Sequence, residues 1–275
     1  MNKNQKPGSI VGKVIIYVAL IVFAITIIVP VAWVFMASFK RNSEFIGAGT
    51  NPWALPKQLF VQNFQVAFQD AQMGEYLLNT VLVTVLALAL ILVIALPAAY
   101  VLSRFRFKGN KILNTVFMAG LFINVNYIVV PIFLMLSDWD KALGFQLFLD
   151  NRIVLALVYA SCHLPFTIYL LSSYFRTLPK GFEEAAYIDG CGYFKTMVKI
   201  MIPMAKPSII TVILFNFLAF WNEYIIALTL MPGASKTLPV GLVTLSKGQM
   251  AAANYGQLYA GLVIVMLPTL ILYIM

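Results

Sequence analysis

The stretch LPKGFEEAAYIDGCGYFKTMVKIMIPMAKP, residues 178–207, is a polar connection in a chain otherwise dominated by long apolar runs. Pro179 suits the first turn of a helix, and the acidic pair Glu183 and Glu184 suits the positive end of that helix. Gly190 can adopt the left-handed conformation that ends many helices. We therefore expect a short helix between about residues 179 and 190, held by something other than its own propensity, since so short a helix is marginal in water.

The composition places the rest of the chain in a membrane. Of its 275 residues, 61% are hydrophobic and 11% are charged, whereas soluble domains carry about 25% charged residues. The net charge of +9 could suggest a nucleic-acid partner. The basic residues lie in short turns between apolar runs, however, where they orient membrane proteins. We expect contact with membrane lipid and none with nucleic acid.

Apolar runs of about 20 residues mark the candidate spans. Backbone groups in lipid must bond within their own segment, so each run is expected to be one helix. The six runs cover residues 13–37, 76–102, 112–136, 152–174, 207–230 and 257–275. The predicted fold is an all-α membrane protein with six transmembrane helices.

The distribution of basic residues predicts the orientation. The N-terminal tail and the connections 104–111 and 175–206 hold 12 of the 19 lysines and arginines, in fewer residues than the alternate connections. Cytoplasmic loops carry this excess. The N-terminus and the 178–207 segment are therefore expected in the cytoplasm.

Several kinds of chemistry are excluded by the residues present. Two cysteines, Cys162 and Cys191, and one histidine, His163, provide no disulfide framework and no metal-binding cluster. The chain has no G-x-x-x-x-G-K phosphate-binding loop. We predict no catalytic site, metal or bound cofactor in this chain, so any ATP must be bound by another subunit.

The short helix has the wrong pattern for lying on lipid. A membrane-surface helix needs a broad apolar face opposite a basic face, but this helix carries acidic residues, which an anionic leaflet repels. The small residues Ala185 and Ala186 would permit close approach to a protein groove. We predict a docking helix for a cytoplasmic partner, with a solvated loop as the alternative.

The spacing within this segment resembles a known family. Glu184-Ala185-Ala186, three residues, Gly190, nine residues and then Ile200-Met201-Ile202-Pro203 looks like the EAA signature of ABC importer permeases, with Ile202 in place of the usual leucine. The order and spacing of further segments are similar to the carbohydrate-importer branch, and in particular to the smaller permease of the maltose system. Those segments are SFK (38–40), AAYVLSRFRFKGNK (98–111), FWNEY (220–224) and KTLPVGL (236–242).

The resemblance implies a type I importer permease of the bacterial cytoplasmic membrane. It implies a second, homologous permease forming a heterodimer with this chain, two ATPase subunits that bind ATP and Mg²⁺, and an extracytoplasmic sugar-binding protein. It makes the short helix between spans four and five the coupling helix. The implied ATPase-coupling residues are Phe182, Glu183, Glu184, Ala185, Ala186, Tyr187, Asp189 and Gly190.

Polar residues inside the expected spans are candidates for a substrate pathway. A charge at mid-span is costly and faces a cavity or a partner. The candidates are Asn124, Asn126 and Tyr127 in the third span and Trp221, Asn222 and Glu223 in the fifth. The alternative for Glu223 is bonding between helices, and His163 is expected to be a packed residue near Pro165.

We predict three parts in the chain. These are a tail and first span (1–37), an external loop (38–75) and a five-span core (76–275) that includes the loop 176–206. The alternative function is an ion-coupled secondary transporter of a small polar solute. Such a protein would show paired broken helices in inverted repeats and intramembrane acids for the ion.

Overall fold

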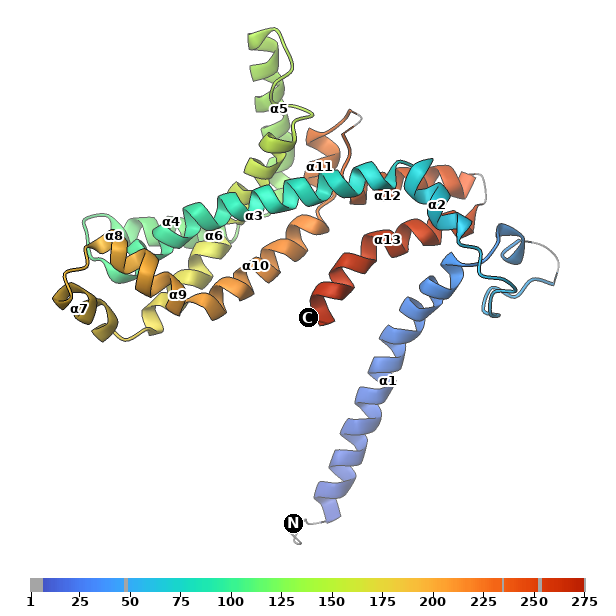
Figure 1. Ribbon diagram of the computed structural model, residues 1–275, viewed down its shortest axis with the longest axis horizontal. Helices are drawn as coiled ribbons and strands as arrows, with labels where there is room; N and C mark the ends of the chain where they lie inside the picture. The colour runs from blue at the N-terminus through green and yellow to red at the C-terminus, as the bar shows by residue number, and fades with distance from the viewer. Residues whose placement is uncertain (1–6, 47–48, 234, 252–253, 275) are drawn as a thin grey trace. The chain divides into compact units, whose positions relative to one another are not determined.

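The computed structural model describes residues 7–46, 49–233, 235–251 and 254–274. All regular structure in those residues is helical, which confirms the predicted all-α class (Figure 1). The chain forms two compact units. One comprises residues 1–74 and 242–275, and the other comprises residues 75–241.

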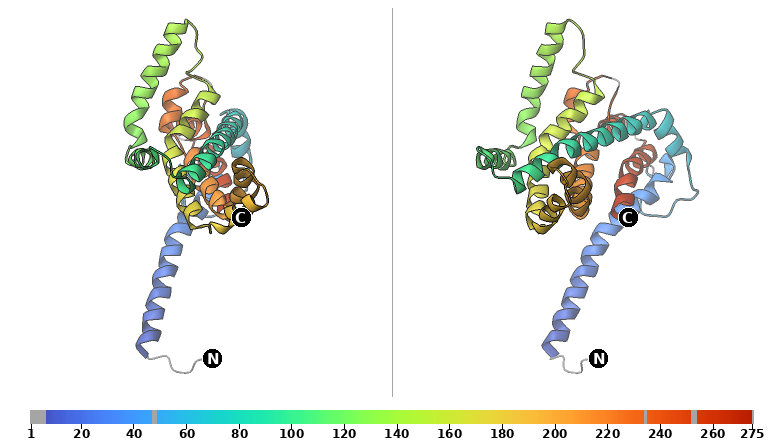
Figure 2. Two further views of the ribbon diagram at one scale, coloured as in Figure 1. Left: turned by 90° about the vertical axis from the view of Figure 1, so that its left-hand side faces the viewer. Right: turned by 60° about the vertical axis from the view of Figure 1, so that its left-hand side comes forward.

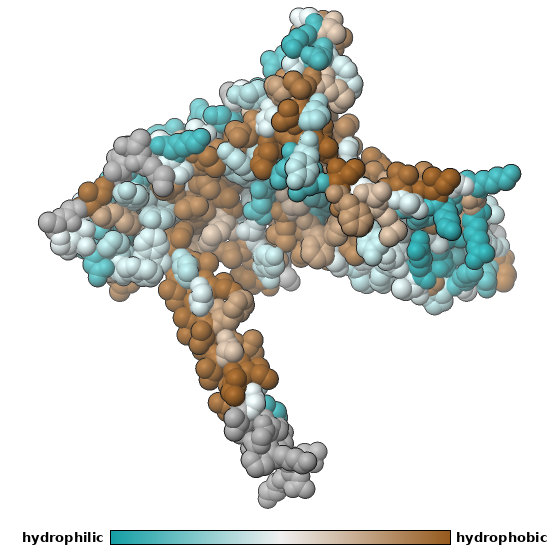
Figure 3. All heavy atoms as spheres, turned by 180° about the vertical axis from the view of Figure 1, so that it is seen from behind, coloured by the Kyte–Doolittle hydropathy of each residue, from teal (hydrophilic) through white to brown (hydrophobic). Residues whose placement is uncertain are grey.

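The first unit is built on α1 (Pro7–Ser38) and α13 (Tyr255–Ile274), with α2 (Gln62–Gln69) and the short η1 (Asn42–Glu44). The helix α13 packs against α1 and α2. Gly256 allows this close approach, because a Cβ there would lie 2.6 Å from the Lys40 carbonyl oxygen. Apolar side chains on α1 between Val14 and Val29 are exposed, as its brown surface in Figure 3 shows, which suits a helix surrounded by lipid.

The second unit contains the central helices. They are α3 (Met73–Arg104, entering at residue 75), α4 (Asn110–Gly120), α5 (Val125–Leu143), α6 (Arg152–Thr177), α7 (Gly181–Ile188), α8 (Tyr193–Thr196), η2 (Met197–Met201), α9 (Ile202–Met204), α10 (Lys206–Trp221) and α11 (Ile225–Leu230). Two apolar cores hold them together, and α3 and α6 contribute to both. One core adds α5, α11 and Phe220 of α10, and the other adds η2 and Val212 of α10.

Four helices among the described residues are long and apolar enough to cross a membrane. They are the helices α1, α3, α6 and α13, in agreement with four of the six predicted runs. Two bent helix pairs would raise the number to six if each pair forms one span. The pair α4 and α5 is bent by 99°, and the segment Tyr193–Met204 meets α10 at 74°.

The prediction of one continuous helix over residues 112–136 was wrong. The helix α4 ends at Gly120, and α5 leaves it steeply from Val125 (Figure 2). Asn124 has an extended backbone, and its side chain accepts a hydrogen bond from the Asn126 N–H at 3.0 Å. This is the geometry of a helix N-cap, so a new helix begins there.

The predicted helix over residues 207–230 is also broken. The helix α10 ends at Trp221 and α11 starts at Ile225. Glu223 lies in the break and accepts hydrogen bonds from the N–H groups of Ile226 (2.8 Å) and Ala227 (3.0 Å). These are two of the free N–H groups that every helix start presents, so Glu223 stabilises the new start.

The connection 231–256, between the last two predicted spans, contains the helix α12 (Leu238–Ala251). Within the second unit, the start of α3 holds the start of α12. The Asn79 amide donates to the Lys236 carbonyl at 3.0 Å, and the Thr80 hydroxyl accepts from the Leu238 N–H at 2.7 Å. Since these partners are more than 150 residues apart, local sequence could not reveal the anchor.

Candidate functional site

The helix α7 has a well-defined end. The Gly190 N–H donates to the Tyr187 carbonyl at 3.1 Å, and the Cys191 N–H donates to the Ala186 carbonyl at 2.9 Å. This pair of bonds is a Schellman motif. Gly190 has φ +76°, and no atom lies within 4 Å of where its Cβ would be. Glycine is therefore required here by backbone conformation and not by crowding, and the predicted helix stop at this residue is confirmed.

One side of the helix α7 packs against the rest of the chain, and its other sides are exposed to solvent. Ala186 is buried, and α7 contacts η2, where Met197 and Met201 are buried. The Ile188 side chain is 86% exposed, and Phe182 and Tyr187 are also exposed. The other exposed residues of the predicted set are Glu184, Ala185, Asp189 and Gly190. An eight-residue helix with exposed apolar side chains has a surface suited to a protein partner.

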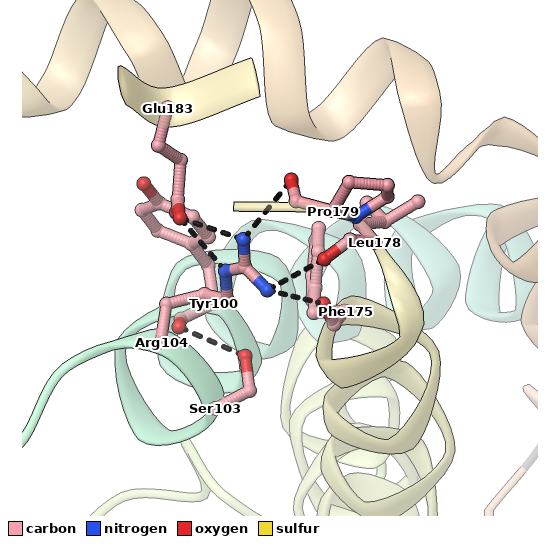
Figure 4. A network of polar contacts seen from close by, with 7 residues as sticks. All are labelled: Tyr100, Ser103, Arg104, Phe175, Leu178, Pro179 and Glu183. Atoms are coloured by element: carbon pink, nitrogen blue, oxygen red, sulfur yellow. Dashed lines mark hydrogen bonds and ion pairs between the residues drawn. The ribbon is translucent and has the colours of Figure 1, made fainter. Parts of the chain in front are cut away.

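Arg104, the last residue of α3, holds the base of α7 (Figure 4). Its guanidinium bonds the Glu183 carboxylate twice, with Nε and a terminal nitrogen 2.9 and 2.7 Å from Oε2. The same group donates to three carbonyls at the end of α6, those of Phe175 (3.2 Å), Leu178 (2.9 Å) and Pro179 (3.4 Å). One side chain thus ties together the ends of α3 and α6 and the start of α7.

This ion pair is shielded from water. The Arg104 and Glu183 side chains are only 6% and 12% exposed. Removing one partner of a buried pair costs about 3–5 kcal/mol, because the other charge is left uncompensated. Without Arg104, the carbonyl groups at the end of α6 that its guanidinium binds would lack hydrogen-bond partners. Glu183 therefore faces the chain's own interior, unlike its neighbour Glu184.

Aromatic side chains extend the same junction. Tyr100 packs edge-on against Phe105 and Phe175, and Phe105 packs edge-on against Tyr193, which in turn meets Tyr187. The ring centroids are 5.4 to 5.7 Å apart, within the favourable range for aromatic pairs. Partial burial and the nearby Glu183 carboxylate raise the pKa of the Tyr187 hydroxyl, so it stays neutral. The end of α7 is thus attached to α3 through these rings, as its start is attached through Arg104.

The turn after α3 is set by its own residues. Gly109 has φ +94°, and the Asn110 amide donates to the carbonyls of Leu102 (3.2 Å) and Phe105 (2.9 Å). These bonds satisfy carbonyls at the end of α3, which an α-helix leaves free. The turn positions Arg104 and Phe105 for their contacts with α6 and α8.

Glu223 forms a second polar site, inside the membrane segments. Besides the two N–H groups of α11, its carboxylate accepts a hydrogen bond from the Tyr159 hydroxyl of α6 at 2.9 Å. Tyr159 is buried and stacks on Phe220, and His163 meets the same Phe220 ring edge-on at 5.1 Å. The carboxylate thus has three donors and links two helices, which is the bonding alternative that the sequence left open.

The other predicted pathway residues lie in two different settings. Trp221 is buried and stacks on Phe217, whereas Asn222 is exposed. Asn124 and Asn126 are exposed, and Tyr127 is 81% exposed. The hydrogen bond of Asn124 stays within its own turn, while those of Glu223 join α11 to α6. These hydrogen bonds therefore do not connect the candidates of the third predicted span with those of the fifth.

Sequence reasoning missed three residues that organise the helix ends and the contacts between helices. Arg104 was seen only within a family-like segment, and Tyr159 was not considered. Asp140, at the end of α5, accepts N–H groups of Leu147, Phe148 and Leu149 at 2.7 to 3.0 Å and so shapes the following loop. A charged residue inside or at the end of an apolar run is the signal that could have found Arg104 and Asp140. Their partners could not be read from the sequence.

Comparison with known proteins gives the family. Residues 91–275 match the family model described as binding-protein-dependent transport system inner membrane component. The chain is 36% identical over 255 residues to the diacetylchitobiose uptake system permease protein NgcG of Streptomyces coelicolor, covering 92% of this chain and 81% of that one. It is 30% identical to the inner membrane ABC transporter permease protein YcjP of Escherichia coli, covering 99% and 94% of the two chains.

The fold is also similar to a solved structure, that of a bacterial ABC transporter involved in the import of the acidic polysaccharide alginate. The TM-score is 0.80 at 24% sequence identity, covering 99% of this chain and 97% of that chain. This chain belongs to the family of binding-protein-dependent transport system inner membrane components. It is a multi-pass permease subunit of an ABC importer in the inner membrane, a transport component and not an enzyme, and the family resemblance seen in its sequence is confirmed.

Proposed function

We propose that this permease carries sugars or oligosaccharides and that α7 is the coupling helix through which partner ATPases move it. The observation that carries the proposal is the mounting of α7. Its base is fixed by the Arg104–Glu183 pair and by buried Ala186, while Phe182 and Ile188 are exposed. A helix that is rigidly attached on one side and open on the other can transmit a displacement.

The substrate class is supported by the relatives. NgcG is a diacetylchitobiose uptake permease, and another relative, 27% identical and covering 92% of this chain, is the probable starch degradation products transport system permease AmyC of Thermoanaerobacterium thermosulfurigenes. Both relatives are thus named for the transport of saccharides. Exposed amides such as Asn124, Asn126 and Asn222, with Tyr127, Trp221 and Glu223 beside them, remain our candidates for the pathway.

The topology proposed has six spans, with α4 and α5 together forming the third span and α10 with α11 forming the fifth. The excess of lysine and arginine in the connections 104–111 and 175–206 supports a cytoplasmic N-terminus and a cytoplasmic α7. Residues 1–37 then form the tail and first span, 38–75 an external segment, and 76–275 the permease core with the coupling loop 176–206.

The mechanism follows from the attachments of α7. ATP with Mg²⁺ would bind in two partner ATPases, whose closure displaces α7. The Arg104 network passes that displacement to α3 and α6, and η2 passes it to α9 and α10, since α7 packs on η2 and η2 on α9. A second, homologous permease would complete the pathway as a heterodimer, and an extracytoplasmic binding protein would deliver the sugar.

Reconstitution tests the proposal. The chain is purified with its partner permease, ATPase and binding protein and placed in proteoliposomes. We expect ATP-dependent uptake of a labelled oligosaccharide and vanadate-sensitive hydrolysis stimulated by the loaded binding protein. Uptake driven by an ion gradient with this chain alone would instead establish the secondary-transporter alternative.

A further inference from the structure

A cleft lies between α4 and α6, beside the junction that Arg104 forms with the end of α6. The two helices are antiparallel, because Asn114 meets Arg176 while Gly120, six residues later, meets Pro165. The cleft has a volume of about 400 Å³. Residues from both helices line it, including Lys111, Asn114, Thr115, Phe117, Ser173 and Arg176.

The cleft is polar at one end and apolar at the other. Lys111 lies in the first turn of α4 and Arg176 in the last turn of α6, so the antiparallel register places both cations at the same end. Thr115 and Ser173 come next, and Phe117, Met118 and Ile168 line the far end. Two cations above an apolar groove match the shape of an anionic amphiphile.

The cations have capacity for a ligand. The Arg176 guanidinium donates through one nitrogen to the Asn114 side chain at 3.3 Å, and a guanidinium has five N–H donors. No hydrogen bond or ion pair to the Lys111 ammonium is found among the residues that the structure describes. Both residues are exposed, so a phosphate could reach both of them from outside the chain.

We propose that this cleft binds the phosphate headgroup of an anionic phospholipid, with Lys111 and Arg176 on the phosphate and an acyl chain along Phe117, Met118 and Ile168. The placement in the cytoplasmic leaflet rests on the orientation proposed above. The binding itself requires only that α4 and α6 are embedded in lipid. A free phosphate would use the same cations but would gain nothing from the apolar end.

The test uses the assembled transporter with all its subunits, in nanodiscs of 30% phosphatidylglycerol and 70% phosphatidylethanolamine. Phosphatidylglycerol retained after transfer to detergent is counted by native mass spectrometry. We expect the double variant Lys111→Gln/Arg176→Gln to bind it about thirtyfold more weakly, because each basic residue near an anionic lipid contributes on the order of 1 kcal/mol and every 1.4 kcal/mol is a factor of ten. The swap Lys111→Arg/Arg176→Lys keeps the charges and should retain the lipid.

The matched control is Lys108→Gln/Lys195→Gln, which removes the same charge from connections 104–111 and 175–206 but outside the cleft. Equal loss in the control would overturn the proposal, because general surface charge would then be responsible. The proposal would also be overturned if Lys111→Gln/Arg176→Gln retained as much phosphatidylglycerol as the wild-type chain. Displacement of the lipid by millimolar glycerol phosphate would show a free-phosphate site instead. Retention is measured without ATP or sugar, so failure of the coupling proposal would not affect this result.

Discussion

Arg104 and Glu183 are 79 residues apart in the chain, yet their side chains meet at 2.7 Å in a site shielded from water. The same guanidinium satisfies three carbonyls at the end of α6. The ends of three helices therefore depend on one side chain. In the proposed coupling mechanism, this side chain is one of the contacts that pass a displacement of α7 to α3 and α6.

Replacing Arg104 by lysine should separate ATP hydrolysis from transport. A lysine keeps the charge, but its ammonium cannot reproduce the planar set of donors that contacts Glu183 and the α6 carbonyls together. We expect sugar uptake to fall at least about tenfold, since a loss of 1.4 kcal/mol in coupling has that effect, while ATP hydrolysis continues. The ratio of uptake to hydrolysis in proteoliposomes measures this.

Arg106→Lys is the matched control, because Arg106 is exposed in the same turn and should tolerate the change. Equal effects at the two positions would show that the Arg104 network does not transmit the movement.

Gly190→Val should disconnect α7 from its partner. Non-glycine residues pay about 1–2 kcal/mol in the left-handed conformation, and a β-branched residue is among the worst there. The helix would end differently, and the exposed face of α7 would be misplaced. Copurification of the ATPase and sugar uptake should both drop.

Asparagine tolerates the left-handed conformation, and nothing crowds the position, so Gly190→Asn should keep most activity. If asparagine failed as completely as valine, backbone conformation would not be the reason for the glycine.

Changes at Glu223 separate a structural role from a substrate role. Glu223→Ala leaves the α11 N–H groups and the Tyr159 hydroxyl without their acceptor, which costs about 1–3 kcal/mol for each buried group. We expect a lower melting temperature in detergent. Tyr159→Phe removes one bond and should cost only about 1 kcal/mol.

Sugar affinity decides between the roles. If Tyr159→Phe leaves the apparent KM unchanged while Glu223→Gln raises it several-fold, Glu223 contacts the substrate as well as α11. Parallel changes in melting temperature and uptake, with KM constant, would leave only the structural role.

Lys40 gives the first unit a pH-dependent stability. Its side chain is inaccessible to solvent and donates to the Pro52 carbonyl at 2.7 Å. Burial lowers its pKa below the ordinary value of 10.5, partly offset by Glu44. The folded state then binds fewer protons than the unfolded state between the lowered pKa and 10.5, so stability should rise with pH in that window.

Lys40→Met removes the titrating group and should flatten this rise. Melting temperatures measured across the alkaline range, for the wild-type chain and the variant, provide the comparison. A rise of equal slope in both chains would assign it to another group.

Composition was sufficient to predict an all-α membrane protein. Local sequence patterns were sufficient to locate the helices that begin and end at their own sequence signals. The run 152–174 became α6 (Arg152–Thr177), and the glycine and proline signals around residues 179–190 located α7. The two bends were missed because an apolar run has the same composition whether the helix is straight or broken. Asn124 was a readable cap signal, since asparagine favours N-caps. The partners of Arg104 and Glu223 depend on tertiary packing and had no local signal.

The segment η2 has a further consequence for how α7 is aimed. It is a π-helical turn between α8 and α9, which holds one more residue per turn than an α-helix. Winding the same residues Met197–Met201 as an ordinary α-helix would rotate α8 by about 100° about the local helix axis relative to α9, because the extra residue would then add its own α-helical step. The π-helical turn absorbs that residue, so it sets the direction in which α7 faces and which surface a partner meets.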